Sequence, residues 1–227
     1  MKFGVMFAIQ GLLLFVFGIA LDGLGLALLW PGACLLYVAA AYLTEAPQRL
    51  GKRTGGQLHP LAVTLLLPWF LALWGVWHLA RRLDRAQPTH RITDALLIGR
   101  RLLPDEVPDG VVHVLDLTCE FSEPSRIVDG YRWQQVPTLD GATPPERELL
   151  EALLRALEDG RPLYIHCAQG HGRTAIAAAL ALGLQGQANS PEDAIATLQS
   201  HRAGIRLSPA QRRYLDGVWS RAITPST

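Results

Sequence analysis

The chain has 227 residues, a formal net charge of +1 and 49% hydrophobic residues. This length allows one or two domains, and a balanced charge without a basic tract gives no support for a nucleic-acid partner. The three cysteines, Cys34, Cys119 and Cys167, are scattered and form neither a disulfide framework nor a paired metal motif. We therefore expect no metal, no other cofactor and a reducing compartment, with Cys34 and Cys119 as small buried hydrophobic side chains.

Three apolar runs occupy the first third of the chain, at residues 3–21, 24–43 and 61–80. Each is close to the ~20 residues that a helix needs to cross the hydrocarbon core of a bilayer. A cleaved signal peptide would give a single run, and the core helices of a soluble domain usually show a polar face that these runs lack. We expect residues 1–85 to form a transmembrane region.

Basic residues flank these runs at Lys2, in the loop 49–53 and after the third run at 81–85. Three complete spans would place the last two groups on opposite sides, so the cytoplasmic preference of Lys and Arg does not decide the orientation. A re-entrant second run, favoured by Pro31 and Gly32, would remove this conflict.

From residue 88 the composition changes to that of a soluble domain, which we expect over residues 88–222. Short apolar or β-branched runs bounded by Gly, Pro and Asp predict extended segments, at residues 91–102, 111–118, 131–139 and 162–166.

Helix signals alternate with these segments. Thr143 is expected as the N-cap of a helix with Glu146 in its first turn and Gly160 at its end. A second helix is expected from near residue 174, and Ser190 and Ser208 give start signals for two more. Strands that alternate with helices indicate an α/β fold with a largely parallel central sheet flanked by helices, preceded here by the helical membrane region.

The stretch YIHCAQGHGRTA, residues 164–175, places Cys167 between a strand and a helix. Gly170 and Gly172 allow the intervening backbone to turn its amides inward, and a ring of N–H groups at a helix N-terminus binds anions. Arg173 adds a planar fork that matches two phosphate oxygens. Positive potential favours the thiolate form of Cys167, which would then be a nucleophile for phosphoryl transfer.

The flanking residues are assigned supporting roles. His166 is expected to hold the loop and tune the thiolate, and Thr174 to donate a hydrogen bond to the sulfur. We do not expect His166 to be a metal ligand, because the sequence shows no second ligand cluster. The expected phosphate-binding residues are Ala168, Gln169, Gly170, His171, Gly172 and Arg173.

His166 and Cys167, followed after five residues by Arg173 and Thr174, resemble the HCx5R[ST] signature of the cysteine-dependent protein tyrosine phosphatase superfamily. The compact domain is similar to the dual-specificity branch over about residues 90–220. ALLIGRRLLP resembles the opening strand of that family, GVVHVLDLTCEF its next strand, and SPEDAIATLQSHRAG part of its closing elements. The resemblance implies hydrolysis of phosphomonoesters through a phosphocysteine intermediate.

The resemblance also implies an aspartate that acts as general acid and then activates water. The candidates are Asp116, Asp129 and Asp140. We favour Asp140, because it follows one extended segment and precedes a helix at a distance before Cys167 that resembles compact family members. The alternative for Asp140 is a turn residue before Gly141.

The sequence leaves two substrates open, a phosphoprotein and a membrane phospholipid such as phosphatidylglycerophosphate or an inositol lipid. Nearby spans favour the lipid through effective concentration, whereas the loop lacks the lysines that family members acting on inositol lipids often carry. A catalytically silent phosphate-binding module is the alternative of another class, and a sulfur-transfer or arsenate-reducing enzyme fits less well. The apolar runs predict a multi-pass membrane protein, and a reactive thiolate favours a catalytic domain that faces the cytoplasm. Solvated surface positions are expected for Arg100, Arg101, Arg202 and Arg206.

Overall fold

The computed structural model describes residues 2–84 and 86–223. The chain divides into two compact units. The N-terminal unit contains Met1–Arg85 together with Cys119–Ser122, and the C-terminal unit contains Ala86–Thr118 and Glu123–Thr227. Residues 1 and 85, which bound the expected membrane region, lie outside the described residues.

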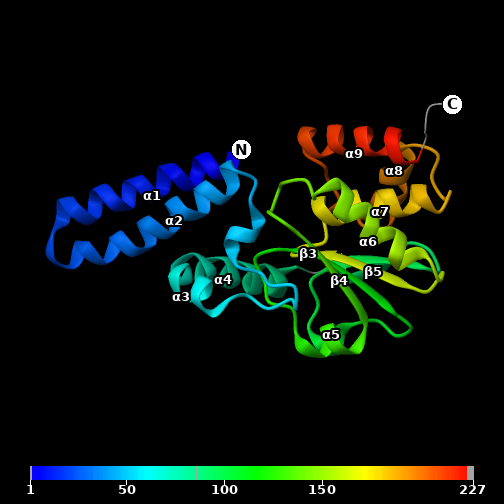
Figure 1. Cartoon of the computed structure of the whole chain (residues 1–227), viewed down its shortest axis with the longest axis horizontal. Coiled ribbons are helices and arrows are strands. Elements are labelled where there is room, and N and C mark those ends of the chain that lie inside the picture. Colours follow the sequence, from blue (N-terminus) through cyan, green and yellow to red (C-terminus); the bar gives the residue numbers. More distant parts are fainter. Residues whose placement is uncertain (1, 85, 224–227) are drawn as a thin grey trace. The chain divides into compact units, whose positions relative to one another are not determined.

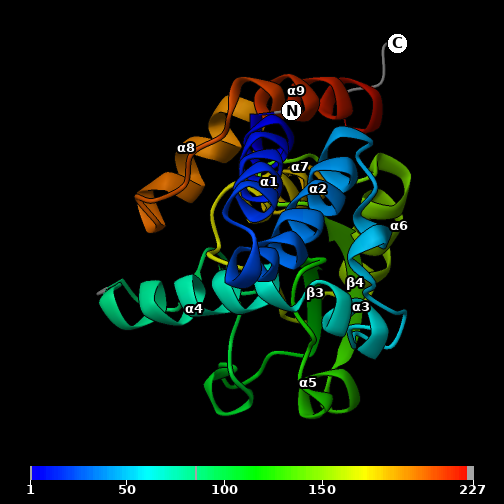
Figure 2. The ribbon, with the colours of Figure 1, turned by 90° about the vertical axis from the view of Figure 1, so that its left-hand side faces the viewer.

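The N-terminal unit begins with a helical hairpin in which α1 (Lys2–Leu21) lies beside α2 (Leu29–Leu43), joined through the 3-10 helix η1 (Gly23–Leu28) (Figures 1 and 2). Gly4, Gly11 and Gly18 are the buried residues of α1. A Cβ at Gly11 would lie 2.9 Å from the carbonyl oxygen of Gly32 in α2. Small residues at this spacing therefore let the two helix backbones approach closely, as in membrane helix pairs.

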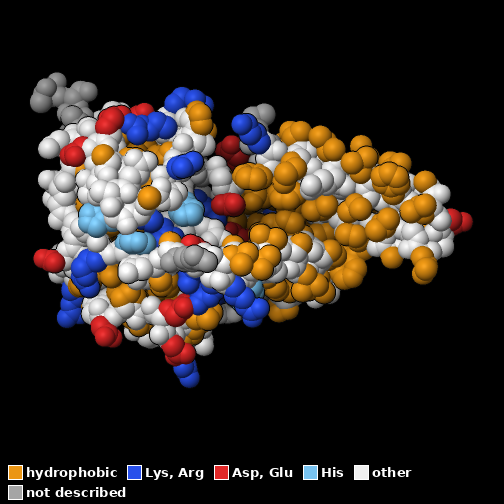
Figure 3. Space-filling view, turned by 180° about the vertical axis from the view of Figure 1, so that it is seen from behind, with side chains coloured by type: hydrophobic (Ala, Val, Ile, Leu, Met, Phe, Trp, Pro, Cys, Tyr) orange, Lys and Arg blue, Asp and Glu red, His pale blue; other side chains and the backbone are white. Residues whose placement is uncertain are grey.

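The surface of this hairpin is apolar. Hydrophobic side chains cover it almost continuously in the space-filling view (Figure 3). Residues Lys2–Leu21 and Gly23–Leu43 are each long and apolar enough to cross a membrane, by length and composition.

The third apolar run, residues 61–80, does not form one continuous helix. It consists of the short α3 (Pro60–Leu65) and of α4 (Leu67–Leu83), with a break at Leu66. Pro68 lies in the first turn of α4, where a proline is tolerated but cannot continue a preceding helix. In the second run, the 3-10 helix η1 passes directly into α2, and Pro31 lies in the first turn of α2.

One face of α4 is buried inside the N-terminal unit. Trp69, Phe70 and Trp77 are buried, and the Trp74 indole donates a hydrogen bond to the carbonyl oxygen of Glu120 at 3.2 Å. The ring of Trp77 lies 5.3 Å from that of Phe121. The aromatic side chains on one face of α4 are therefore buried by contacts within the N-terminal unit.

The C-terminal unit contains a five-stranded sheet in the order β1-β2-β5-β3-β4, in which only the β1–β2 pair is antiparallel. The expected α/β fold with a mostly parallel sheet is confirmed. The strands are β1 (Thr89–Arg91), β2 (Leu96–Arg100), β3 (His113–Thr118), β4 (Arg132–Thr138) and β5 (Leu163–Cys167), with a 3-10 helix, η3 (Pro104–Glu106), after β2. Since β2 to β5 are parallel, their carboxyl ends meet at one edge.

Helices α6 and α7 pack on one face of this sheet, α8 and α9 pack against α7 on the same side, and α5 lies on the other side (Figure 1). Nearly all of α7 is buried, because its alanines allow close packing in the main core. The helices are α5 (Ser125–Gly130), α6 (Glu146–Leu157), α7 (Gly172–Leu184), α8 (Pro191–His201) and α9 (Pro209–Ala222).

The first residues of α6, α8 and α9 show which of the expected N-caps form. Ser190 and Ser208 are the N-caps of α8 and α9, and each side chain accepts a hydrogen bond from the backbone three residues later. Thr143 is not the cap of α6, whose N-cap is Pro145 without a side-chain hydrogen bond. The two prolines of the TPPE stretch delay the start of the helix, since a residue before proline disfavours helical backbone.

Candidate active site

Cys167 is the last residue of β5, the central strand of the sheet, and α7 begins five residues later at Gly172. The helix therefore starts two residues earlier than the sequence predicted. The loop of residues 168–171 runs from the carboxyl edge of the sheet into the N-terminus of a long buried helix. Such a position concentrates backbone N–H groups and the positive end of the helix dipole around Cys167.

Gly170 fixes the path of this loop. Its φ angle is +70°, and a Cβ there would lie 2.3 Å from the backbone carbonyl of Gly99 in β2. The backbone N–H of Arg101 also donates a hydrogen bond to the carbonyl oxygen of Ala168 at 3.3 Å. Only glycine combines this backbone conformation with this close approach.

Arg173 lies in the first turn of α7 and is 2% exposed. Its Nη1 donates hydrogen bonds to the carbonyl oxygens of Thr138 at 2.7 Å and Leu117 at 3.4 Å, and its Nη2 pairs with Asp140 Oδ1 at 3.0 Å. Carbonyls from the ends of β3 and β4 thus hold the guanidinium at the sheet edge where Cys167 lies.

Of the three candidate acids, the structure brings Asp140 to Arg173. Asp140 follows the carboxyl end of β4, and its side chain is 61% exposed, so it can meet a substrate at the surface. Asp116 is fully buried in β3 and accepts two hydrogen bonds from Thr118. Asp129 is in α5, before the amino end of β4 and so toward the opposite edge of the sheet.

His166 lies between two buried carboxylates. Its Nδ1 is 4.0 Å from Asp116 Oδ1 and its Nε2 is 3.8 Å from Glu123 Oε1. These three residues could together hold a metal ion, a grouping that sequence spacing did not show. However, Arg101 Nε lies 3.3 Å from the second oxygen of Glu123, so a guanidinium already pairs with one of the two carboxylates. We interpret the group as a buried charge network under the cysteine loop.

The hydroxyl of Thr174 is buried and makes no hydrogen bond among the residues that the structure describes. A buried hydroxyl without a partner has a donor left for a nearby group. The loop residues Ala168, Gln169 and His171 are partly exposed, whereas Gly170 and Arg173 are buried. The loop thus presents its variable side chains toward solvent.

Arg202, at the end of α8, supports the loop from outside and was expected to be a solvated surface residue. It is 3% exposed, and its guanidinium donates to the carbonyl oxygens of Gly170 at 3.0 Å, Gln169 at 2.9 Å and Gln87 at 2.9 Å. Arg100 and Arg101 are also buried, and only Arg206 of the four arginines is exposed. No periodic pattern in the sequence indicates this burial, because the contacts join segments far apart in the chain.

Two further side chains border the site, although the sequence did not indicate this position for them. Gln211, the N3 residue of α9, donates to the carbonyl oxygen of Ala142 at 3.2 Å, and a Cβ at Gly172 would touch its amide. His90 Nδ1 lies 3.1 Å from Arg202 Nη1, and burial followed by the charge of Arg202 lowers the pKa of His90. A neutral His90 can accept a hydrogen bond from the guanidinium.

Tyr164 is buried in β5, three residues before Cys167. Its hydroxyl donates to the carbonyl oxygen of Arg100, and its ring stacks on His166 with centroids 5.6 Å apart. Burial raises the pKa of Tyr164 well above its ordinary value, so the hydroxyl stays protonated and keeps this hydrogen bond.

Comparison with known proteins gives fold-level matches. No protein-family model matches the chain, and no curated protein matches it. Solved structures do match: the crystal structure of PTPMT1 in complex with PI(5)P is 25% identical, with a TM-score of 0.51, over 61% of this chain and 97% of that one. Tk-PTP in its active form is 21% identical, with a TM-score of 0.52, over 58% of this chain and 95% of that one. The C-terminal unit therefore has the fold of the cysteine-dependent phosphatases of the protein tyrosine and dual-specificity type.

Proposed function

We propose that this protein is a membrane-anchored phosphatase that hydrolyses phosphomonoesters through a cysteinyl-phosphate intermediate, with a membrane phospholipid as the favoured substrate. The observation that carries the proposal is the meeting of Cys167, Arg173 and Asp140 at one edge of the sheet. Cys167 and Arg173 belong to the signature, and Asp140 lies in a separate loop that precedes it. A protein with the same fold could lack any of the three.

In the first step, the Cys167 thiolate attacks the phosphorus atom and forms a sulfur–phosphorus bond. The bond from phosphorus to the ester oxygen breaks, and Asp140 transfers a proton to that leaving oxygen. The loop N–H groups and the Arg173 fork stabilise the charge that develops on the phosphoryl oxygens.

In the second step, Asp140, now a carboxylate, accepts a proton from water while the water oxygen attacks phosphorus. The sulfur–phosphorus bond breaks, inorganic phosphate leaves, and Thr174 can donate a hydrogen bond to the departing sulfur. The contact between Arg173 Nη2 and Asp140 is compatible with this cycle. A phosphate that binds the fork would compete with Asp140 and release the carboxyl group toward the leaving oxygen.

The membrane anchor is proposed to be the α1–α2 hairpin. With two spans, Lys2 and the basic residues at 49–53 and 81–82 all lie on one side of the membrane. The conflict that three spans created is then absent, and the preference of Lys and Arg for the cytoplasm favours a cytoplasmic phosphatase domain.

Two observations favour a lipid over a phosphoprotein. An anchor of this kind would keep the active site near headgroups and raise their effective concentration. PTPMT1, the solved neighbour described above, binds PI(5)P in its crystal structure. The absence of lysine from residues 168–172 argues for a headgroup with less charge than a polyphosphorylated inositol.

The test is a phosphate-release assay on the full chain in mixed micelles, with phosphatidylglycerophosphate and a phosphotyrosine peptide as parallel substrates. Cys167→Ser should abolish turnover of both, whereas Cys119→Ser, which removes another buried thiol, should not. Rapid acid quenching should trap a phosphoenzyme in the wild type. Faster turnover of the lipid supports the proposal, and preference for the peptide would make the protein an anchored phosphoprotein phosphatase.

No turnover of either substrate, with a phosphate analogue such as tungstate still bound, would instead show a silent phosphate-binding module. The intact set of Cys167, Arg173 and Asp140 makes this the less favoured outcome.

A further inference from the structure

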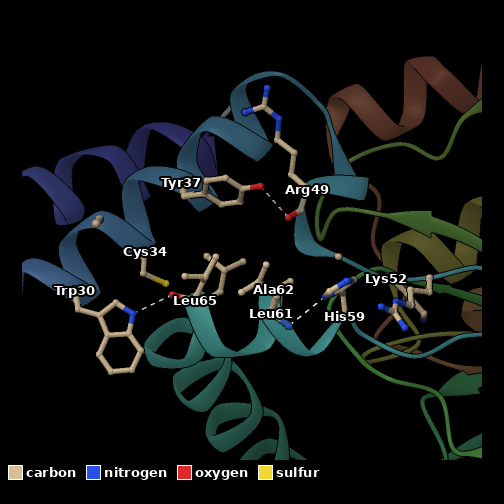
Figure 4. Close-up of a pocket in the computed structure, with 13 residues that line it drawn as sticks. Trp30, Cys34, Tyr37, Arg49, Lys52, His59, Leu61, Ala62 and Leu65 are labelled. Atoms are coloured by element: carbon tan, nitrogen blue, oxygen red, sulfur yellow. Dashed lines mark hydrogen bonds between the residues drawn. The ribbon is translucent and has the colours of Figure 1, made fainter.

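A cavity of about 650 Å³ lies within the N-terminal unit, between α2, the loop after η2 (Pro47–Leu50) and α3. This volume is in the range of small-molecule ligand sites, roughly 300–1,000 Å³. Figure 4 shows the side chains that surround it. Its lining residues are Trp30, Ala33, Cys34, Tyr37, Arg49, Gly51, Lys52, Arg53, His59, Leu61, Ala62, Leu65 and Leu66.

Most of the lining is apolar. Trp30 and Tyr37 from α2 are 50% and 46% exposed, and they face Leu61 and Leu65 of α3 across the cavity (Figure 4). The Trp30 indole donates a hydrogen bond to the carbonyl oxygen of Leu65 at 3.0 Å, which ties α2 to α3 at that end. The walls are thus long aliphatic and aromatic surfaces that suit a hydrocarbon chain.

The opposite end of the cavity is basic. Lys52 and His59 lie there, away from Trp30 (Figure 4), and Arg53 follows Lys52 in the same loop. Arg49 belongs to η2, and its side chain points away from the cavity (Figure 4). The described lining contains no aspartate or glutamate. The polarity of the cavity therefore runs from apolar along α2 to cationic beyond its end.

Backbone contacts hold the basic loop against α3. Gly51 has a φ angle of +83°, and a Cβ there would lie 2.5 Å from the Cβ of Ala62. The N–H of His59 donates to the carbonyl oxygen of Gly51 at 2.8 Å, and Lys52 forms a β-bridge with Leu58. The loop thus forms a fixed end wall.

We infer that this cavity binds one anionic phospholipid, with an acyl chain between α2 and α3 and the headgroup phosphate at Lys52 and Arg53. A phospholipid has the same order of chemistry as the cavity, apolar along the membrane-spanning direction and anionic at the interface. Basic pockets beside membrane helices commonly bind such headgroups. This site is separate from the cysteine loop and would hold a lipid without cleaving it; it rests on the proposed membrane insertion of α1 and α2.

The experiment uses the full chain carrying Cys167→Ser, so that lipid is bound but not consumed. It is titrated in micelles with acyl-brominated phosphatidylglycerol or acyl-brominated phosphatidylcholine, and tryptophan fluorescence is recorded. The chain has six tryptophans, so the signal of Trp30 is obtained as the difference from the same protein with Trp30→Phe. Flotation with vesicles of the same lipids tests membrane insertion independently.

We expect saturable quenching of Trp30, with half-saturation at about tenfold less phosphatidylglycerol than phosphatidylcholine. The double variant Lys52→Gln, Arg53→Gln should lose most of this preference. The matched double variant Lys2→Gln, Arg82→Gln removes two charges outside the cavity and should keep it. Ala33→Phe, which narrows the cavity without changing charge, should weaken the quenching by both lipids.

Equal quenching by the two lipids, linear in their mole fraction, would overturn the inference, because the cavity would then be ordinary lipid-facing surface. Protection of Trp30 that depends on protein concentration would also overturn it and assign the surface to a second copy of the chain. If flotation is retained in either case, the proposed membrane anchor stands while the cavity proposal fails. If the full chain does not float with the vesicles, the proposed membrane anchor and the cavity proposal are both overturned.

Discussion

Arg202 offers a test of how the cysteine loop is held, because it contacts the loop from the side away from the proposed phosphate. Its guanidinium donates to the carbonyl oxygens of Gln169 and Gly170 at 2.9 and 3.0 Å and is 3% exposed. When these carbonyls are bound outside the loop, the adjacent amides can point inward. We predict that Arg202→Ala damages catalysis although Arg202 does not belong to the signature.

The size of the effect follows from the contacts. Arg202 also donates to the carbonyl oxygen of Gln87 at 2.9 Å, so three carbonyls lose a charged donor. Each such hydrogen bond contributes about 1.5–3 kcal/mol when buried. Water can reach the partly exposed Gln169, so we expect a loss of roughly 3 kcal/mol in the free energy of unfolding. A loop displaced by about 1 Å costs on the order of 10²-fold in rate.

The assay measures kcat/KM on a soluble aryl phosphate, together with urea unfolding of the same preparations. Arg202→Ala is compared with Arg202→Lys, which keeps the charge but loses the planar fork, and with Arg206→Ala, which removes an exposed arginine nearby. We expect Arg202→Lys to be intermediate and Arg206→Ala to resemble the wild type. Since binding of tungstate reports on the loop directly, it should weaken in folded Arg202→Ala.

The reasoning would be refuted by an Arg202→Ala protein that is folded and retains kcat/KM within twofold of Arg206→Ala. A protein that loses stability but binds tungstate and turns over substrate normally would show that Arg202 stabilises the domain without positioning the loop.

Three further predictions follow from single residues. Asp140→Asn should lower kcat by about 10²-fold or more on poor leaving groups and less on good ones, with tungstate binding kept; an equal loss on all leaving groups would contradict its role as acid. Gly170→Ala should lower stability and activity, because its Cβ meets backbone at 2.3 Å, whereas Gly186→Ala, with a similar φ of +68° but open space, should change stability only. Because burial and Arg202 lower the pKa of His90 in the folded state, the unfolded state binds more protons and stability should fall as pH drops below about 6.5. His90→Asn should flatten this fall in unfolding titrations, and an unchanged slope would contradict the argument.

The candidate site was predictable where its chemistry is local. Cys167, Gly170 and Arg173 lie within a few residues, and glycine conformation, helix polarity and guanidinium geometry already indicate a phosphate loop there. Asp140 was predictable because parallel strands bring their carboxyl ends together, so a loop after one strand lies near a loop after another.

The apolar N-terminal region shows what hydropathy misses. Apolar composition predicted three spans, but Pro68 divides the third run, and the tryptophans of α4 pack inside the N-terminal unit. A hydropathy window counts apolar side chains without regard to what covers them. The cavity proposed to bind lipid is a similar case, since Trp30 and Lys52 are far apart in sequence and line one space only after folding.

The sequence by itself indicated a phosphate-binding loop around a cysteine, because a thiol, a glycine-rich turn and an arginine at fixed spacing form one local backbone motif. It also determined the layer order, because strand and helix periodicities are local properties. Only the tertiary structure decided which buried charges support the motif. Arg202 contacts the loop and Glu123 lies near His166, and both come from distant parts of the chain. No periodicity in the sequence records such contacts. The energetic cost of burying a charge depends on whether an opposite charge lies beside it, and only the fold decides that.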